Sequence, residues 1–159
     1  MKSTKTDTVE EKGRRILIRE LKKRGHTVES LKEFAHAKDL VVDGKIDVQV
    51  KISSSAQWQL HYFKLLKVDV INDIQHFKQL RKLPHPEMVW LFYSLSEKEV
   101  FILTERDVQR LVAKDIKGYY GVDDRHDKIV RTKNPFSDHC ALKIKHLNPY
   151  KDNWRIFKR

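Results

Sequence analysis

Residues 39–51 read DLVVDGKIDVQVK, two short runs of alternating apolar residues around an Asp-Gly pair. An Asp-Gly pair between two such runs predicts a β-hairpin. Side chains two residues apart on a strand project from the same face, so Gln49 and Lys51 point the same way. If the hairpin brings Asp39 beside them, a carboxylate, an amide carbonyl and an ammonium group meet at one point. This combination suits a site for a metal ion and a water molecule.

The length of the hairpin loop decides whether Asp39 meets Gln49. With a two-residue turn Asp39 faces Val48 and projects from the other face than Gln49, because a shift of one residue exchanges the faces. With a three-residue loop or a bulge, Asp39 faces Gln49. That register separates an apolar face from a polar one: Leu40, Val42, Ile46, Val48 and Val50 against Asp39, Asp47, Gln49 and Lys51. Burial of the apolar face favours the three-residue loop. An ordinary hairpin with a solvated polar face is the alternative interpretation.

Hydrophobic spacing and turn residues divide the rest of the chain into further elements. The expected helices cover residues 8–24, capped by Asp7 or Thr8, residues 69–83, ended by Pro84, and Thr104 to about Lys117, with Asp107 completing a capping box. The expected strands are a weak one at 26–34, the hairpin strands at 38–42 and 45–52, a buried strand at 88–95 and its hairpin partner at 100–103. Residues 56–68 fit a strand or a helix, residues 118–136 read as a loop, and residues 141–157 give a mixed signal.

The composition is that of a folded, soluble protein. Its 159 residues predict one domain, with 40% hydrophobic and 35% charged residues. No apolar run approaches the ~18 residues of a membrane span, and residues 1–15 lack the apolar stretch of a signal peptide. We therefore expect a cytoplasmic protein without a membrane partner. The single cysteine, Cys140, excludes an intramolecular disulfide and a zinc site built on cysteine pairs.

The charge points to a polyanionic partner. Thirty-three Lys and Arg residues against 22 Asp and Glu leave a net charge of +11, and the isoelectric point is near 9.7. Nucleic acid is the commonest partner of such an excess. A generally basic soluble protein without such a partner is the alternative, and charge alone does not separate DNA from RNA or cutting from binding.

With these features the chain resembles the PD-(D/E)XK nuclease superfamily, which includes restriction endonucleases, archaeal Holliday-junction resolvases and intron-encoded homing endonucleases. The family core runs α-β-β-β-α-β and resembles the order expected over residues 8–95. Asp39 matches the family's Asp at the start of the second core strand. Gln49-Val50-Lys51 matches its (D/E)-x-K on the third strand, with Gln as in the D…QxK branch of restriction-type members.

The resemblance implies an α/β (α+β) fold, a restriction-endonuclease-like core with a mixed central sheet flanked by helices. A single nuclease-like domain would span residues 1–159, with its core at about 8–117 and a C-terminal extension at 118–159. The implied activity is Mg²⁺-dependent hydrolysis of DNA phosphodiester bonds, of the restriction, homing or junction-resolving type, with Mn²⁺ as a substitute ion. The implied partner is double-stranded or branched DNA, and many members of the family act as homodimers or higher homo-oligomers.

The family's chemistry also implies roles for individual residues. The metal ligands would be Asp39, the Gln49 side-chain carbonyl, the Val50 backbone carbonyl and, through water, Glu10. Lys51 would orient the attacking water or neutralise charge that develops on the phosphate. Many members carry a glutamate on the first helix, and Glu10 is preferred because it lies nearer an end of that helix. The alternative acids are Glu11, Glu20 and Asp47.

Because Gln49 brings no charge, a nucleic-acid-binding protein on the same fold that has lost the chemistry is an alternative function. An RNA-directed nuclease is a further alternative. Phosphate contacts are expected from Ser53, Ser54, Ser55, Lys22, Lys23 and Arg24, although a serine run is also typical of a loop and basic residues of a solvated surface. Trp58, His61 and Tyr62 are candidates for base stacking or for the core. A weaker resemblance to an HNH nuclease or zinc site involves His126, Asn134, His139 and Cys140.

Overall fold

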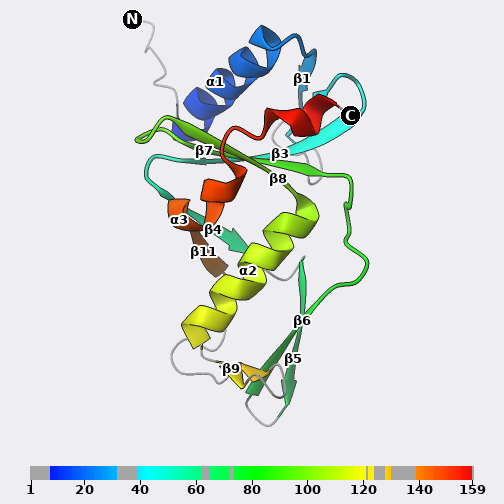
Figure 1. Ribbon diagram of the computed structural model, residues 1–159, viewed down its shortest axis with the longest axis vertical. Coiled ribbons are helices and arrows are strands. Elements are labelled where there is room, and N and C mark those ends of the chain that lie inside the picture. Colours follow the sequence, from blue (N-terminus) through cyan, green and yellow to red (C-terminus); the bar gives the residue numbers. More distant parts are fainter. Residues whose placement is uncertain are drawn as a thin grey trace, which may run out of the picture.

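A mixed five-stranded sheet forms the centre of the molecule (Figure 1). The computed structural model describes residues 8–31, 39–61, 65–71, 74–120, 122–123, 128–129 and 139–158. The strands of the central sheet lie in the order β1 (Val28–Ser30), β2 (Leu40–Val42), β3 (Ile46–Ser53), β7 (Val89–Ser94) and β8 (Glu99–Thr104). The β3–β7 pair is parallel, and the other neighbours are antiparallel. Together with the flanking helices this sheet confirms the expected α+β fold class.

Each face of the central sheet carries its own hydrophobic core. On one face α1 (Val9–Lys23) packs through Gly13, Leu17 and Leu21, beside the C-terminal 3₁₀ helix η2 (Trp154–Lys158). On the other face lies α2 (Glu105–Tyr120), with Val108 and Val112 in the core. Figure 1 shows α1 and α2 on opposite sides of the sheet.

The remaining elements extend the α2 side of the sheet. β4 (Gln57–His61) pairs with β11 (His139–Lys143), which leads into α3 (Ile144–Leu147) and η1 (Asn148–Tyr150). A four-stranded sheet has the order β5 (Leu66–Ile71), β6 (Ile74–Gln79), β10 (Lys128–Ile129) and β9 (Val122–Asp123). The chain therefore passes from β3 to the parallel strand β7 through three strands rather than through a helix.

The helix expected at residues 69–83 is wrong, because β5 and β6 form an antiparallel hairpin there. Residues 66–71 read LKVDVI, a period-two pattern of β-branched residues, and residues 72–73 are Asn-Asp, a turn signal. The apolar residues of this segment also fit a helical spacing, and the pairing of β5 with β6 decides between the two. The expected order α-β-β-β-α-β consequently fails at its second helix. The second helix of the structure is α2, which follows β8.

Most of the other expected elements are confirmed. The buried strand at 88–95 and its partner at 100–103 are β7 and β8, and the weak strand at 26–34 is the short β1. Thr8 caps α1 by accepting the Glu11 N–H at 3.2 Å, and Thr104 accepts the Asp107 N–H in the same way at the start of α2. The loop expected over residues 118–136 is wrong in part, because α2 continues to Tyr120 and two short strands, β9 and β10, lie within that range.

Polar side chains at the start of α2 bind the segment that leads to β7. The Glu105 carboxylate, 3% exposed, accepts the His85 N–H at 2.9 Å. The Gln109 amide, fully buried, donates to the carbonyls of Leu65 and Leu80 at 2.8 and 2.9 Å. These bonds satisfy backbone groups that the crossover would otherwise bury without partners.

We expect Glu105→Gln to change how the free energy of unfolding depends on pH. Burial raises the pKa of Glu105, outweighing the His85 N–H and nearby charges, which lower it. The folded protein therefore holds this proton more tightly than the unfolded chain, and the stability that this contributes is lost as pH rises from the unfolded to the folded pKa. Denaturant titrations between about pH 4 and pH 7 should show the variant gaining stability relative to the wild type as pH rises. A difference that stays constant over this range would contradict the assignment.

Gly13 allows α1 to approach β3 closely. A Cβ atom at Gly13 would lie 2.7 Å from Ile52 Cδ1, and Ile52 Cγ2 would be closer still. Real Cβ atoms do not come this close to carbon atoms, so no larger residue fits without movement of α1 or Ile52.

We therefore expect Gly13→Ala to destabilise the fold by about 1–3 kcal/mol through overpacking. In an Ile52→Ala background the same change should be neutral or stabilising, because alanine favours a helix over glycine by about 1 kcal/mol. Urea denaturation of the four proteins measures this reversal of sign. An equal effect of Gly13→Ala in both backgrounds would show that the close approach is not limiting.

Candidate functional site

The β2–β3 hairpin has the register that sets Asp39 opposite Gln49. Its paired residues are Leu40 with Val48, Val41 with Asp47 and Val42 with Ile46. Three residues, 43–45, therefore form the loop, as predicted, and Asp43 and Gly44 have φ angles of +53° and +68°. The same register continued by one residue brings Asp39 beside Gln49, so the prediction of the register is confirmed.

Asp43 anchors this loop to the end of α1. Its carboxylate lies 2.8 Å from His26 Nδ1 and accepts the Thr27 N–H at 2.9 Å. The hydrogen bond with His26 is the main cause that lowers the pKa of Asp43, and the Thr27 N–H adds to it. Aspartate tolerates a left-handed conformation better than most residues because its short side chain bonds locally.

The Asp39 carboxylate continues the hydrogen-bond ladder of β3 beyond the end of β2. The Asp39 N–H donates to the Val48 carbonyl at 2.8 Å, and Asp39 Oδ2 accepts the Val50 N–H at 2.8 Å. The carbonyl of a strand residue points to the same side as its N–H, so the Val50 carbonyl is directed toward Asp39 as well. Two oxygen donors of the predicted metal site therefore share one edge of β3.

Arg14 is a member of this site that the sequence interpretation missed. Its Nη2 donates to Asp39 Oδ1 at 3.0 Å, and the two side chains are 17% and 20% exposed. Nη2 also lies 3.9 Å from Glu10 Oε1, so Glu10 stands next to the residue that holds Asp39. The sequence signal for this role was the position of Arg14 on the border of the apolar stripe, three residues before Leu17 and seven before Leu21.

Gln49 and Lys51 lie on the face of β3 that carries α2. The parallel register aligns Gln49 with Trp90 and Lys51 with Phe92 on β7. Lys51 Nζ lies 5.9 Å from the centre of the Trp90 ring, within range of a cation–π contact. Both side chains are half-buried.

The three alternative acids have different surroundings. Glu11 completes the N-terminal cap of α1, where its carboxylate accepts a backbone N–H at 3.4 Å. Glu20 lies 4.0 Å from Lys23 Nζ near the other end of the helix. Asp47 is half-buried two residues before Gln49 on β3. Among these, Asp47 shares a strand and a face with the predicted ligands.

The serines expected to contact phosphate shape the β3–β4 turn. Ser53 Oγ donates to the Gln57 carbonyl at 2.7 Å and accepts the Ser55 N–H at 3.1 Å. Ser94 Oγ donates to the Ser55 carbonyl at 2.6 Å. Ser54 is exposed. These hydrogen bonds give Ser53 and Ser55 a structural role in the turn. Contact of these serines with phosphate stays a prediction.

The basic residues at the end of α1 lie on the surface. Lys22, Lys23 and Arg24 are exposed, and the Arg24 guanidinium stacks 4.2 Å from the centre of the Trp154 ring. Arg24 therefore connects the end of α1 with the C-terminal helix η2.

Trp58 belongs to the core rather than to a base-stacking surface. It is 3% exposed, and its indole N–H donates to the Tyr93 carbonyl at 3.3 Å. Other candidates lie outside the residues or side chains that the structure describes: His61, Tyr62, His126, Asn134, His139 and Cys140.

The donors around Asp39 fit a magnesium ion that keeps several of its waters. They are oxygen atoms, as Mg²⁺ prefers, and Mg²⁺ is often held by one or two carboxylates. Within the described ranges, no three His, Cys, Asp or Glu side chains gather closely enough to form a metal cluster. Because Arg14 already binds one oxygen of Asp39, a cation there must share the carboxylate with the guanidinium or displace it.

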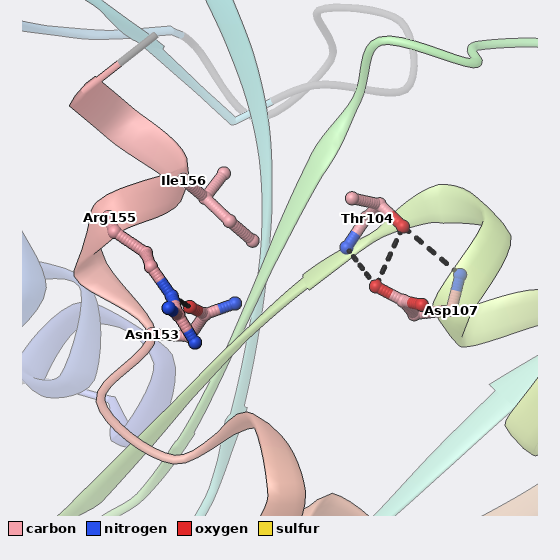
Figure 2. A pocket seen from close by; sticks show the side chains of 5 residues that line it. All are labelled: Thr104, Asp107, Asn153, Arg155 and Ile156. Carbon is pink, nitrogen blue, oxygen red and sulfur yellow. Dashed lines mark hydrogen bonds between the residues drawn. The ribbon is translucent and has the colours of Figure 1, made fainter.

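Two surface hollows lie away from these residues. Figure 2 shows the first, of about 320 Å³, between the start of α2 and the C-terminal segment, lined by Thr104, Asp107, Asn153, Arg155 and Ile156. Asp107 is engaged in the helix cap, and Arg155 Nε donates to Asn153 Oδ1 at 3.1 Å. The second, of about 260 Å³, lies at the starts of β3 and β7. Neither hollow contains a predicted site residue.

Each helix within the described ranges is too short or too polar to cross a membrane.

The chain is similar to a solved structure of known function. No family model matches the chain, and no curated protein matches it. The solved structure of a bacterial homing endonuclease, I-Ssp6803I, is similar to the chain with 16% sequence identity and a TM-score of 0.46. The alignment covers 96% of this chain and 92% of that chain.

We expect the Arg14–Asp39 ion pair to contribute to stability. Replacing Asp39 by alanine leaves the half-buried guanidinium and the Val50 N–H without an acceptor, which should cost about 2–3 kcal/mol. Asp39→Asn keeps an acceptor for the Val50 N–H and should cost less. A double-mutant cycle with Arg14→Met and Asp39→Asn, measured by urea denaturation, isolates the pair. A coupling energy near zero would show that the ion pair does not form in solution.

Proposed function

We propose that the chain is a metal-dependent endonuclease that hydrolyses phosphodiester bonds in double-stranded or branched DNA. The observation that carries the proposal is the hairpin register, which sets Asp39 opposite Gln49 with Lys51 on the same face of β3. These residues match the motif positions of the nuclease superfamily that the sequence resembles. The net charge of +11 favours a polyanionic substrate.

Asp39, the Gln49 side-chain carbonyl and the Val50 carbonyl would hold the metal ion, with Glu10 acting through water. Bound Mg²⁺, or Mn²⁺ in its place, supplies a water of lowered pKa and stabilises charge on the phosphate. Lys51 would orient that water or neutralise the charge that develops on the phosphate. The half-buried position of Lys51 makes its charge more effective than it would be in bulk water.

A DNA-binding protein without catalytic activity is the second candidate function, and one contact favours it. Arg14 already neutralises Asp39 at 3.0 Å, so the carboxylate has a partner without a metal ion. Gln49 adds no negative charge to attract a cation. On this alternative, the Arg14–Asp39 pair is purely structural.

Cleavage assays on the full chain should separate the two functions. The substrates are a supercoiled plasmid, a four-way DNA junction, single-stranded DNA and RNA, each with Mg²⁺, Mn²⁺ or a chelator. We expect metal-dependent cutting of duplex or branched DNA, and a loss of at least about a hundredfold in rate for Lys51→Ala and for Asp39→Asn. Lys114→Ala removes an exposed charge from α2 and serves as the matched control, with an unchanged rate.

Gln49→Glu tests the unusual motif position in the same assay. A second carboxylate should lower the Mg²⁺ concentration needed for half-maximal cutting. Cutting that persists in both Asp39→Asn and Lys51→Ala would place the active site elsewhere. DNA binding without cutting under every condition would support the non-catalytic candidate instead.

A further inference from the structure

The outer surface of α1 carries a continuous row of basic side chains. Its members, here called the basic face of α1, are all exposed: Lys12, Arg15, Arg19, Lys22 and Lys23. At about 100° per residue they fall within an arc of roughly 100°. The centre of this arc lies opposite the stripe of Gly13, Leu17 and Leu21, which packs against the sheet. The row therefore points away from the protein.

Acidic side chains of α1 lie outside this arc. Glu10 lies in line with the buried stripe at the start of the helix, Glu20 borders the stripe, and Glu11 is tied into the N-terminal cap. Glu10 lies 3.9 Å from Arg14, Glu20 lies 4.0 Å from Lys23, and Arg15 also has an interaction partner. The basic face thus keeps an excess of positive charge across the length of the helix.

Like charges three and four residues apart destabilise an isolated helix. Such neighbours occur repeatedly on this face, as in Arg15 with Arg19 and Arg19 with Lys22 or Lys23. A polyanion lying along the face would reverse this repulsion. The row from Lys12 to Lys22 is about 15 Å long, and one strand of B-DNA presents about four phosphates over that distance.

We propose that the basic face of α1 binds the phosphate backbone of duplex DNA as a surface separate from the Asp39 site. Helix α1 reaches the Asp39 site through Arg14 and Glu10, and both lie outside the arc of the basic face. Gln49 and Lys51 lie on the sheet face that carries α2. The contact would be independent of sequence, because it uses charge and reads no base edges. The proposal rests on the proposed function only in taking DNA as the partner.

A membrane surface fits this face less well. Amphipathic helices that bind lipid insert an apolar side, and the apolar side of α1 is buried against the sheet. In the part of the chain that the structure describes, Val9, 43% exposed, is the large apolar side chain on the surface. The face therefore offers charge without an apolar group to insert.

Fluorescence anisotropy with a labelled DNA duplex tests the proposal in chelator, so that binding is measured without cleavage. The test variant is the full chain with Arg15→Gln, Arg19→Gln and Lys22→Gln. The control variant loses the same net charge from other exposed positions, with Lys82→Gln, Arg110→Gln and Lys114→Gln. Thermal unfolding of both variants checks that the fold is retained.

We expect the test variant to bind at least about tenfold more weakly at low salt and to lose two to three units from the slope of log affinity against log salt concentration. The control variant should lose less than twofold in affinity. Equal losses in the two variants would overturn the proposal, because net charge alone would then explain binding. Unchanged DNA binding with loss of binding to phosphatidylserine vesicles would overturn it in favour of a membrane.

The same experiment separates this proposal from the proposed function. Asp39→Asn should leave the salt slope unchanged, because that residue does not belong to the basic face. If the wild type cuts no substrate but the test variant still loses binding selectively, the basic face stands and the nuclease activity fails. If cutting is found and binding does not depend on the basic face, the nuclease activity stands and the proposal for the basic face fails.

Discussion

The geometry of the site depends on the left-handed loop that joins β2 to β3. Asp43 and Gly44 adopt positive φ angles, and the bonds of Asp43 to His26 and Thr27 hold the loop against the end of α1. A loop one residue shorter would turn Leu40 and Val42, which are fully buried, toward the other face. The hydrophobic effect therefore selects the register, and the position of Asp39 beside Gln49 follows from that selection.

Helix α1 packs against the sheet on one side and carries basic residues on the other. Gly13 lets the helix approach Ile52 on β3 more closely than any other residue would. Arg14, the next residue, donates to Asp39 at the edge of the sheet. The outward side is left to basic residues, which need no packing partner. One helix thus connects the core, the candidate site and a charged surface.

The hairpin, β7, β8 and both helix caps could be predicted because each is encoded by neighbouring residues. Alternation of apolar side chains, an Asp-Gly turn and the Thr104–Asp107 box are local patterns with local physical causes. The segment at 69–83 could not be assigned in the same way, since its apolar residues fit both a strand and a helix. The β5–β6 hairpin is itself local, but β6 also pairs with β10, and Gln109 bonds to Leu65 and Leu80; these contacts join residues distant in sequence.

The sequence by itself determined that Asp39, Gln49 and Lys51 would share one face of a hairpin, because a strand alternates its side chains and burial allows one register. Only the tertiary structure brought Arg14 to Asp39 and set Trp90 beside Lys51, since these contacts join segments 25 and 39 residues apart. It likewise showed that the basic face of α1 points outward, because which side of a helix is buried depends on the sheet against which it packs.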